Sequence, residues 1–407
     1  MIINMKIDKK KSTVFAIIFI GLVINGAGQS ILFSTLPSVF RDLGLPDLWI
    51  GIIVSCSAFT LVIFSTIWGK IIDYTSNKIS YIVGLTSFGF GTLIFVSVLD
   101  MLYLDMISTT TTIISLIVIR IIYAALTAGM HPSSLSYVTK NYSDKVKVNK
   151  ISLISSAFTL GLCIGPSLVI LTRFGNSLTP IYFISIVALF VSIIAYVGIP
   201  SQTSVIEKKE VVSHSQGNIK NTLHLLFIVI VMNALFSSTQ QNIGFLVQEL
   251  NGQTGLSSIE NTGLLVSILA FSLLATQVFI VRTLSVSVES MIFIGFSMTL
   301  AFILVSIKSS SIYHMMLAMI FLGVGFGILI PSVQSKISSI YPSEKQGYIA
   351  GVIFSCASIG YIIGPIIGTA FNSKNIKSTY LIGLLILLLS AVFYAIGSMS
   401  KKRKVTI

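Results

Sequence analysis

Hydrophobic and polar positions alternate along this chain in long blocks. Apolar stretches of about 20 residues, the length that a helix needs to cross a bilayer, follow one another from end to end. Short polar segments separate them. We predict twelve membrane-spanning helices, at residues 14–36, 49–68, 79–98, 113–138, 151–172, 181–199, 223–247, 261–281, 291–307, 312–337, 347–371 and 380–399.

The composition agrees with an all-α membrane protein. The 407 residues are 54% hydrophobic and only 10% charged, whereas soluble domains carry about 25% charged residues. The mean hydropathy is +0.95. Cys56, Cys163 and Cys356 lie in apolar stretches far apart in the sequence, which indicates neither a disulfide framework nor a metal site.

The net charge of +13 is explained by its distribution. If the N-terminus lies in the cytoplasm, most Lys and Arg residues fall in cytoplasmic segments, whereas the acidic residues divide almost evenly between the two sides. An excess of Lys and Arg is typical of cytoplasmic loops of membrane proteins. The charge distribution therefore predicts that both termini are cytoplasmic. Anionic lipid head groups attract such segments, so the basic charge requires no nucleic-acid partner.

An internal repeat divides the chain in two. The pattern Gly-x-x-x-Gly-Pro lies at Gly161, Gly165 and Pro166 and again at Gly360, Gly364 and Pro365. Two glycines four residues apart let a neighbouring helix approach closely, and the proline bends its own helix. A block starting at Gly51 also matches one starting at Gly263. We therefore predict two pseudo-symmetric six-helix bundles, 1–199 and 223–407, joined by a cytoplasmic linker, 200–222.

Two further motifs carry a family resemblance. The segment between the second and third spans keeps Gly69, Asp73 and Lys78 of the pattern G-x-L-A-D-R-x-G-R-K/R. In the fourth span, Arg120 is followed four residues later by the small residue Ala124. With the first Gly-Pro motif, these residues resemble the twelve-span drug:proton antiporter branch of the major facilitator superfamily.

This resemblance implies a secondary active transporter that works by alternating access in a bacterial inner or cytoplasmic membrane. It implies export of a drug or metabolite, driven by the proton gradient, by a chain acting as a monomer. The motif residues Gly69, Asp73, Lys78 and the two Gly-Pro motifs are then expected to act in gating. No nucleotide-binding motif is found, and no cofactor or metal is expected.

Arg120 and His131 are the leading candidates for substrate binding or proton coupling. A charge inside a bilayer is costly and indicates function by default, and histidine titrates near physiological pH. If residues 113–138 form one helix, the two side chains face the same direction about 16 Å apart. A structural anchor for Arg120 and a simple hydrogen-bonded role for His131 remain alternatives.

Polar and aromatic residues on the first, fourth, seventh and tenth spans supply the remaining candidates, since the resemblance implies that these spans line the cavity. The offset that aligns Gly51 with Gly263 also aligns Gln29 with Gln241, which predicts a symmetry-related pair. Hydrogen bonding between helices is the alternative role for any single amide. The candidates are Asn25, Gln29, Tyr123, Asn233, Phe236, Gln240, Gln241 and Gln334.

All thirteen acidic residues lie in predicted loops or at the ends of spans. A hydrophobic cation, as in multidrug efflux, is usually held by a buried acid, so we favour an anionic cargo such as a carboxylate siderophore. Multidrug efflux of cations and import of a sugar or amino acid are the alternatives. An enzyme is disfavoured because the four histidines are scattered and form no catalytic constellation.

Overall fold

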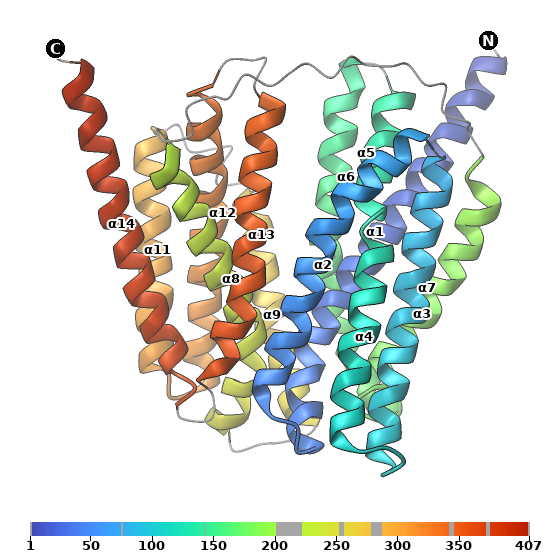
Figure 1. Ribbon diagram of the computed structural model, residues 1–407, viewed down its shortest axis with the longest axis horizontal. Coiled ribbons are helices and arrows are strands. Elements are labelled where there is room, and N and C mark those ends of the chain that lie inside the picture. The colour runs from blue at the N-terminus through green and yellow to red at the C-terminus, as the bar shows by residue number, and fades with distance from the viewer. Residues whose placement is uncertain are drawn as a thin grey trace. The chain divides into compact units, whose positions relative to one another are not determined.

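The computed structural model describes residues 2–74, 76–142, 144–200, 222–251, 256–277, 287–341, 346–371 and 375–405. Twelve candidate membrane spans lie within these ranges, which confirms the predicted number and the all-α fold (Figure 1). Most of the predicted linker, residues 201–221, lies outside the described residues. The helices are α1 (Ile2–Asp42), α2 (Asp47–Tyr74), α3 (Asn77–Tyr103), α4 (Thr109–Thr127), α5 (Met130–Asn141), α6 (Asp144–Ile164), the 3₁₀ helix η1 (Gly165–Phe174), α7 (Thr179–Gly198), α8 (Leu223–Asn251), α9 (Leu256–Ala275), α11 (Val288–Lys308), α12 (Ile312–Ser338), α13 (Gln346–Ala370) and α14 (Ser378–Val405).

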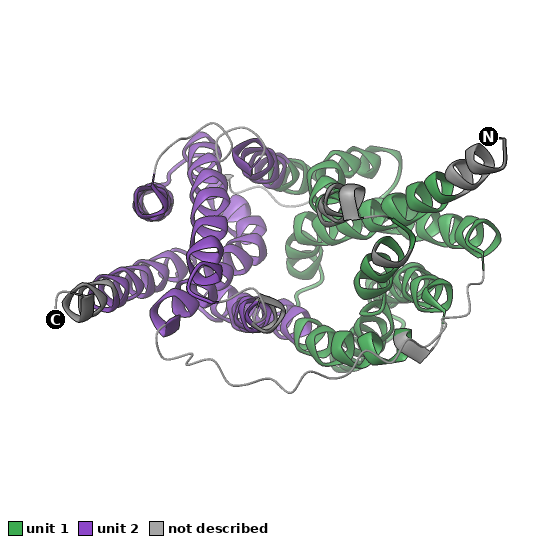
Figure 2. Ribbon diagram, turned by 90° about the horizontal axis from the view of Figure 1, so that it is seen from above, with its two compact units in different colours: residues 1–45, 56–209, 255–263 green, residues 46–55, 210–254, 264–407 purple. Residues whose placement is uncertain are grey.

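The chain forms two compact units, drawn in different colours in Figure 2. Unit 1 comprises residues 1–45, 56–209 and 255–263, and unit 2 comprises residues 46–55, 210–254 and 264–407. The boundary does not simply follow the linker, because the first turns of α2 belong to unit 2 and those of α9 belong to unit 1.

In the first turns of α2 and of α9, a glycine allows the helix to pack closely on the unit to which these turns belong. In unit 2, a side chain at Gly51 of α2 would meet the carbonyl oxygen of Pro365 at 2.6 Å. In unit 1, a side chain at Gly263 of α9 would meet the carbonyl oxygen of Pro166 at 3.2 Å. The two glycines are matched in the sequence repeat at an offset of 212 and the two prolines at an offset of 199, so each unit builds the equivalent contact.

Unit 1 is organised around α1 and α3. Helix α1 packs on α6 and α7, and α3 packs on α4 and α7. The buried Tyr81 of α3 donates its hydroxyl to the carbonyl oxygens of Ile17 and Ile18 on α1, at 3.2 and 3.0 Å. Gly21 of α1 leaves room for that ring.

Unit 2 pairs α8 with α13 and α11 with α12, while α14 contacts both α8 and α11. Lys336 of α12 connects three helices, since its ammonium donates to Glu289 Oε1 of α11 and to the Tyr394 hydroxyl of α14, each at 2.9 Å. The Lys336 ammonium also lies 5.1 Å from the Tyr394 ring centre, as expected of a cation–π contact.

The Gly-x-x-x-Gly pairs hold the first and fifth spans of each half together. Gly165 lies against the Ser30 hydroxyl of α1, and Gly364 lies against the Ser237 hydroxyl of α8. In both places a methyl group would collide with the facing helix. The predicted close helix approach is therefore observed in both units.

This shared packing also corrects one predicted symmetry relation. Because Ser30 and Ser237 occupy equivalent places, Gln29 is equivalent to Phe236 and not to Gln241. The offset taken from Gly51 and Gly263 fails here because Ser237 lies 26 residues before Gly263, whereas Ser30 lies only 21 residues before Gly51.

The two Gly-Pro motifs differ in conformation. The α-helix α6 ends at Ile164, and Pro166 stands at the start of η1, a 3₁₀ helix. Pro365 lies inside α13, which continues as an α-helix to Ala370. A proline removes one backbone hydrogen bond and crowds the preceding turn, and only the first copy responds by changing helix type.

Candidate functional site

Arg120 is buried in unit 1, and the described residues supply no acidic partner for it. The residue is 5% exposed, and its Nε atom has no hydrogen-bond partner among them. Its guanidinium carbon lies 4.9 Å from the Tyr123 ring centre and 5.6 Å from the Phe95 ring centre. The ion pairs found in the described ranges do not include it. Aromatic faces offset part of the cost of burying this charge.

Tyr123 connects Arg120 to α1. The side-chain amide of Gln29 donates a 2.7 Å hydrogen bond to the Tyr123 hydroxyl. Tyr123 is 5% exposed, and its ring centre lies 6.0 Å from that of Phe88. We call Gln29, Tyr123 and Arg120, with the rings of Phe88 and Phe95, the Arg120 cluster. Three predicted site residues from two helices are thus brought together.

No described contact joins His131 to this cluster. The single span predicted for residues 113–138 is confirmed as Thr109–Val138, but its helix is interrupted at residues 128 and 129. Helix α4 ends at Thr127 and α5 begins at Met130. Pro132 has no N–H to donate to the carbonyl of Ala128 and crowds that carbonyl. Residues 128 and 129 keep right-handed helical backbone angles, so the common direction of Arg120 and His131 stays a prediction. His131 is exposed, and its ring centre lies 5.7 Å from that of Phe158.

The candidates in unit 2 have different surroundings. Asn233 donates to the carbonyl of Val229 in its own helix at 2.7 Å, as a structural amide would. The rings of Phe236 and Phe326 lie 4.4 Å apart. Gln240 and Gln241 are buried, and within the described part of the chain neither polar atom of the Gln241 amide has a partner. Gln334 is partly exposed.

Other buried polar atoms also lack a hydrogen-bond partner among the described residues. One is Nδ2 of Asn25, a predicted candidate on α1. Another is the buried hydroxyl of Ser238 on α8, outside the predicted site. Serines are frequent in these spans, so the sequence carried no signal that would have singled out Ser238.

The acidic residues in the described ranges lie near helix ends or in turns, as predicted. Glu260, in the second turn of α9, forms a two-point contact with Arg173 of η1. Arg173 Nε donates to Glu260 Oε1 at 2.7 Å, and Nη2 donates to Oε2 at 3.2 Å. Both side chains are accessible to solvent, and exposed pairs of this kind stabilise a fold only weakly.

Of the motif residues Gly69, Asp73 and Lys78, between the second and third spans, only Lys78 has a described side-chain contact. A side chain at Gly69 would meet nothing within 4 Å among the described residues. The Asp73 side chain lies outside the described residues. The Lys78 ammonium lies 5.0 Å from the Tyr196 ring centre, and Ser136 of α5 donates to Asn77 Oδ1 at 3.1 Å.

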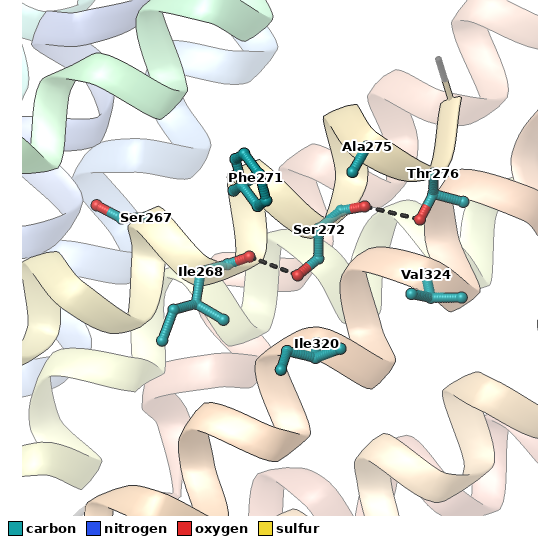
Figure 3. A pocket seen from close by; sticks show the side chains of 8 residues that line it. All are labelled: Ser267, Ile268, Phe271, Ser272, Ala275, Thr276, Ile320 and Val324. Atoms are coloured by element: carbon teal, nitrogen blue, oxygen red, sulfur yellow. Dashed lines mark hydrogen bonds between the residues drawn. The ribbon is translucent and has the colours of Figure 1, made fainter. Parts of the chain in front are cut away.

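An open cavity of about 520 Å³ lies in unit 2 between α9 and α12. As Figure 3 shows, Ser272 and Thr276 direct their hydroxyls to carbonyl oxygens of their own helix, those of Ile268 and Ser272, each at 2.7 Å. Polar groups that converge on a ligand usually mark a specific site, whereas two of the three hydroxyl groups in this lining are engaged by their own helix. It contains no predicted site residue; its lining is Ser267, Ile268, Phe271, Ser272, Ala275, Thr276, Ile320 and Val324.

Comparison with known proteins identifies the class to which this fold belongs. The Major Facilitator Superfamily profile matches residues 18–239 and 226–406. The chain belongs to the Major Facilitator Superfamily, and its fold is that of a membrane transporter, as the sequence motifs predicted.

Several relatives are similar over nearly the whole chain. Multidrug resistance protein 2 of Bacillus subtilis (strain 168) is 22% identical over 391 residues, covering 91% of this chain and 92% of the relative. Multidrug resistance protein 1 of the same organism is 23% identical over 368 residues, covering 88% and 90%.

Solved structures agree on the fold. A bacterial homologue of the human lysosomal transporter Spinster has a TM-score of 0.73 at 12% identity, with coverage of 96% of this chain and 97% of the other. The nucleoside transporter NupG has a TM-score of 0.72 at 15% identity, with coverage of 96% and 98%. Its membership of the superfamily and its twelve candidate spans make the protein a multi-pass secondary transporter for a small molecule.

Proposed function

We propose that this transporter exports a small organic anion by alternating access, driven by inward movement of protons. The two sequence repeats, 1–199 and 223–407, act as the moving halves, and both termini lie in the cytoplasm. A carboxylate-bearing metabolite such as a siderophore is the specific cargo that we favour. The chain works as a monomer in this proposal.

The observation that carries the proposal is the charge of Arg120, for which the described residues offer no counter-ion. A guanidinium stays protonated at any physiological pH, and a buried charge without a counter-ion is costly. Its planar N–H groups match a carboxylate at two points. The aromatic rings of Tyr123 and Phe95 hold it in place but cannot neutralise it. An anionic cargo would supply the missing partner.

Proton coupling in this proposal uses His131 together with the charge of Arg120. The acidic residues in the described ranges lie near helix ends or in turns, so a carboxylate deep in a span is not the coupling group. Imidazole titrates in the physiological range, and His131 is exposed. Its protonation would alternate with the binding and release of the anion.

Efflux of hydrophobic cations is the second candidate. It is favoured by the names of the relatives, which are multidrug resistance proteins. The Phe236–Phe326 pair supplies aromatic surface suited to such cargo. The two candidates differ in what Arg120 does, because a cation gains nothing from a buried guanidinium.

Purified protein in liposomes with an imposed proton gradient separates the candidates. Carboxyfluorescein serves as the anionic probe and ethidium as the cationic one. We expect gradient-dependent movement of carboxyfluorescein that is lost in Arg120→Ala at equal protein content. Movement of ethidium alone, undisturbed by Arg120→Ala, would refute the anion proposal and support the second candidate. In cells, deletion under iron limitation should cause a carboxylate siderophore to accumulate inside.

A further inference from the structure

We infer that Trp68 is a positioning residue that sets the angle between the helix carrying Arg120 and the helix carrying His131. The indole Nε1 of Trp68, on α2, donates a 2.8 Å hydrogen bond to the carbonyl oxygen of Ala125. Ala125 lies in the last turn of α4, where carbonyl groups lack a partner within the helix. Trp68 therefore caps α4 from outside.

The ring of Trp68 also fills the joint between α4 and α5. A side chain at Gly129 would meet Trp68 Cδ2 at 2.9 Å and Cγ at 3.1 Å. Gly129 stands directly before α5, so the indole lies against the backbone between the two helices. Only glycine leaves enough room for this arrangement.

The second half of the chain provides an internal comparison. Pro331 is the counterpart of Pro132 in the sequence repeat, yet α12 continues unbroken from Ile312 to Ser338. Ile328 stands at the position equivalent to Gly129, and its side chain would exclude a ring from that place. Proline alone therefore does not separate the helices. The glycine and the indole are the additional elements in unit 1.

Two contacts connect α5 to the neighbouring helices α2 and α3. Trp68 of α2 lies against Gly129, directly before α5, and Asn77 of α3 accepts the hydrogen bond from Ser136 further along α5. A displacement of α2 or α3 would therefore move α5, and His131 with it, relative to α4. The consequence for transport rests on the proposed function, whereas the geometry of the joint does not.

The test measures the distance between α4 and α5 across the joint. Spin labels at Ile122 on α4 and Leu135 on α5, both exposed, report the distance across the joint after Cys56, Cys163 and Cys356 are replaced. Trp68→Phe keeps a ring but removes the indole N–H. We expect a broadened or shifted distance distribution and an initial rate of carboxyfluorescein export about fivefold to tenfold lower, as for loss of one hydrogen bond.

Trp49→Phe is the matched control, because Trp49 is the only other tryptophan of the chain. Gly129→Ala is the second variant, since its methyl group must displace the indole and reproduce the effect of Trp68→Phe. A distance distribution in Trp68→Phe identical to that of Trp49→Phe would overturn the inference. So would a changed distribution with export at the wild-type rate. If the wild-type protein moves no carboxyfluorescein, the anion proposal fails, while the distance measurement still decides what Trp68 does at the joint.

Discussion

Gln29 of α1 and Tyr123 of α4 are joined by a 2.7 Å hydrogen bond between their side chains. Tyr123 also lies close to Arg120, whose guanidinium carbon is 4.9 Å from its ring centre. The tyrosine thus fixes one face of the only arginine found inside a described span away from its ends. The charge is held in place from α1 and α4 but is not neutralised by them.

Arg120→Lys should remove most anion export while preserving the charge. Lysine presents a compact ammonium and not a planar fork, so it cannot form the two-point contact with a carboxylate. We expect the rate of carboxyfluorescein export to fall about tenfold, with protein yield unchanged. Export by Arg120→Lys at the wild-type rate would mean that only the sign of the charge matters.

Tyr123→Phe should test whether the hydroxyl group orients the cluster. Phenylalanine retains the ring over the guanidinium but leaves the Gln29 amide without its acceptor. A smaller effect than that of Arg120→Lys is expected, about threefold to fivefold on export. Gln29→Leu removes the same hydrogen bond from the other side, and the double variant should show little additional loss. Fully additive effects would indicate that the two side chains act separately.

The sequence sufficed for the fold because the relevant signals are local. Apolar length fixes each span, and the Gly161 and Gly360 pairs need only their own spacing to predict close packing. The joint between α4 and α5 was missed because it depends on Trp68, a residue distant in sequence. Likewise, the equivalence of Gln29 and Phe236 depends on a segment whose length differs between the halves.

The candidate site was predicted only in part, because some of its residues carry a local signal in the sequence and others do not. Arg120 stands out as a charge in an apolar stretch, and Tyr123 follows it within one turn, so both could be named. The packing of α3 against α4 brings the Phe95 ring to the guanidinium and the Phe88 ring to Tyr123, and no pattern in the sequence specifies either ring. The surroundings of the Ser238 hydroxyl are likewise a property of packing.

His131→Gln should uncouple export from the proton gradient. Glutamine retains hydrogen-bonding capacity but does not titrate between pH 5 and 8. We expect gradient-driven accumulation of carboxyfluorescein to be lost while exchange of probe across liposomes without a gradient continues. His314→Gln is the control, because His314 bonds Ser311 at the start of α12. Accumulation by His131→Gln equal to that of the control would remove His131 from coupling.

Gly364→Ala should destabilise unit 2 by pressing α13 away from α8. The added methyl group would meet the Ser237 hydroxyl and the Ala234 Cα, the latter at 3.1 Å, and backbone atoms cannot rotate aside. Overpacking of this kind costs about 1–3 kcal/mol. Thermal unfolding in detergent should show a lowered midpoint for Gly364→Ala. Gly69→Ala is the matched control, since a side chain there meets no described atom within 4 Å. Equal midpoints for the two variants would mean that α8 and α13 are less closely packed than described.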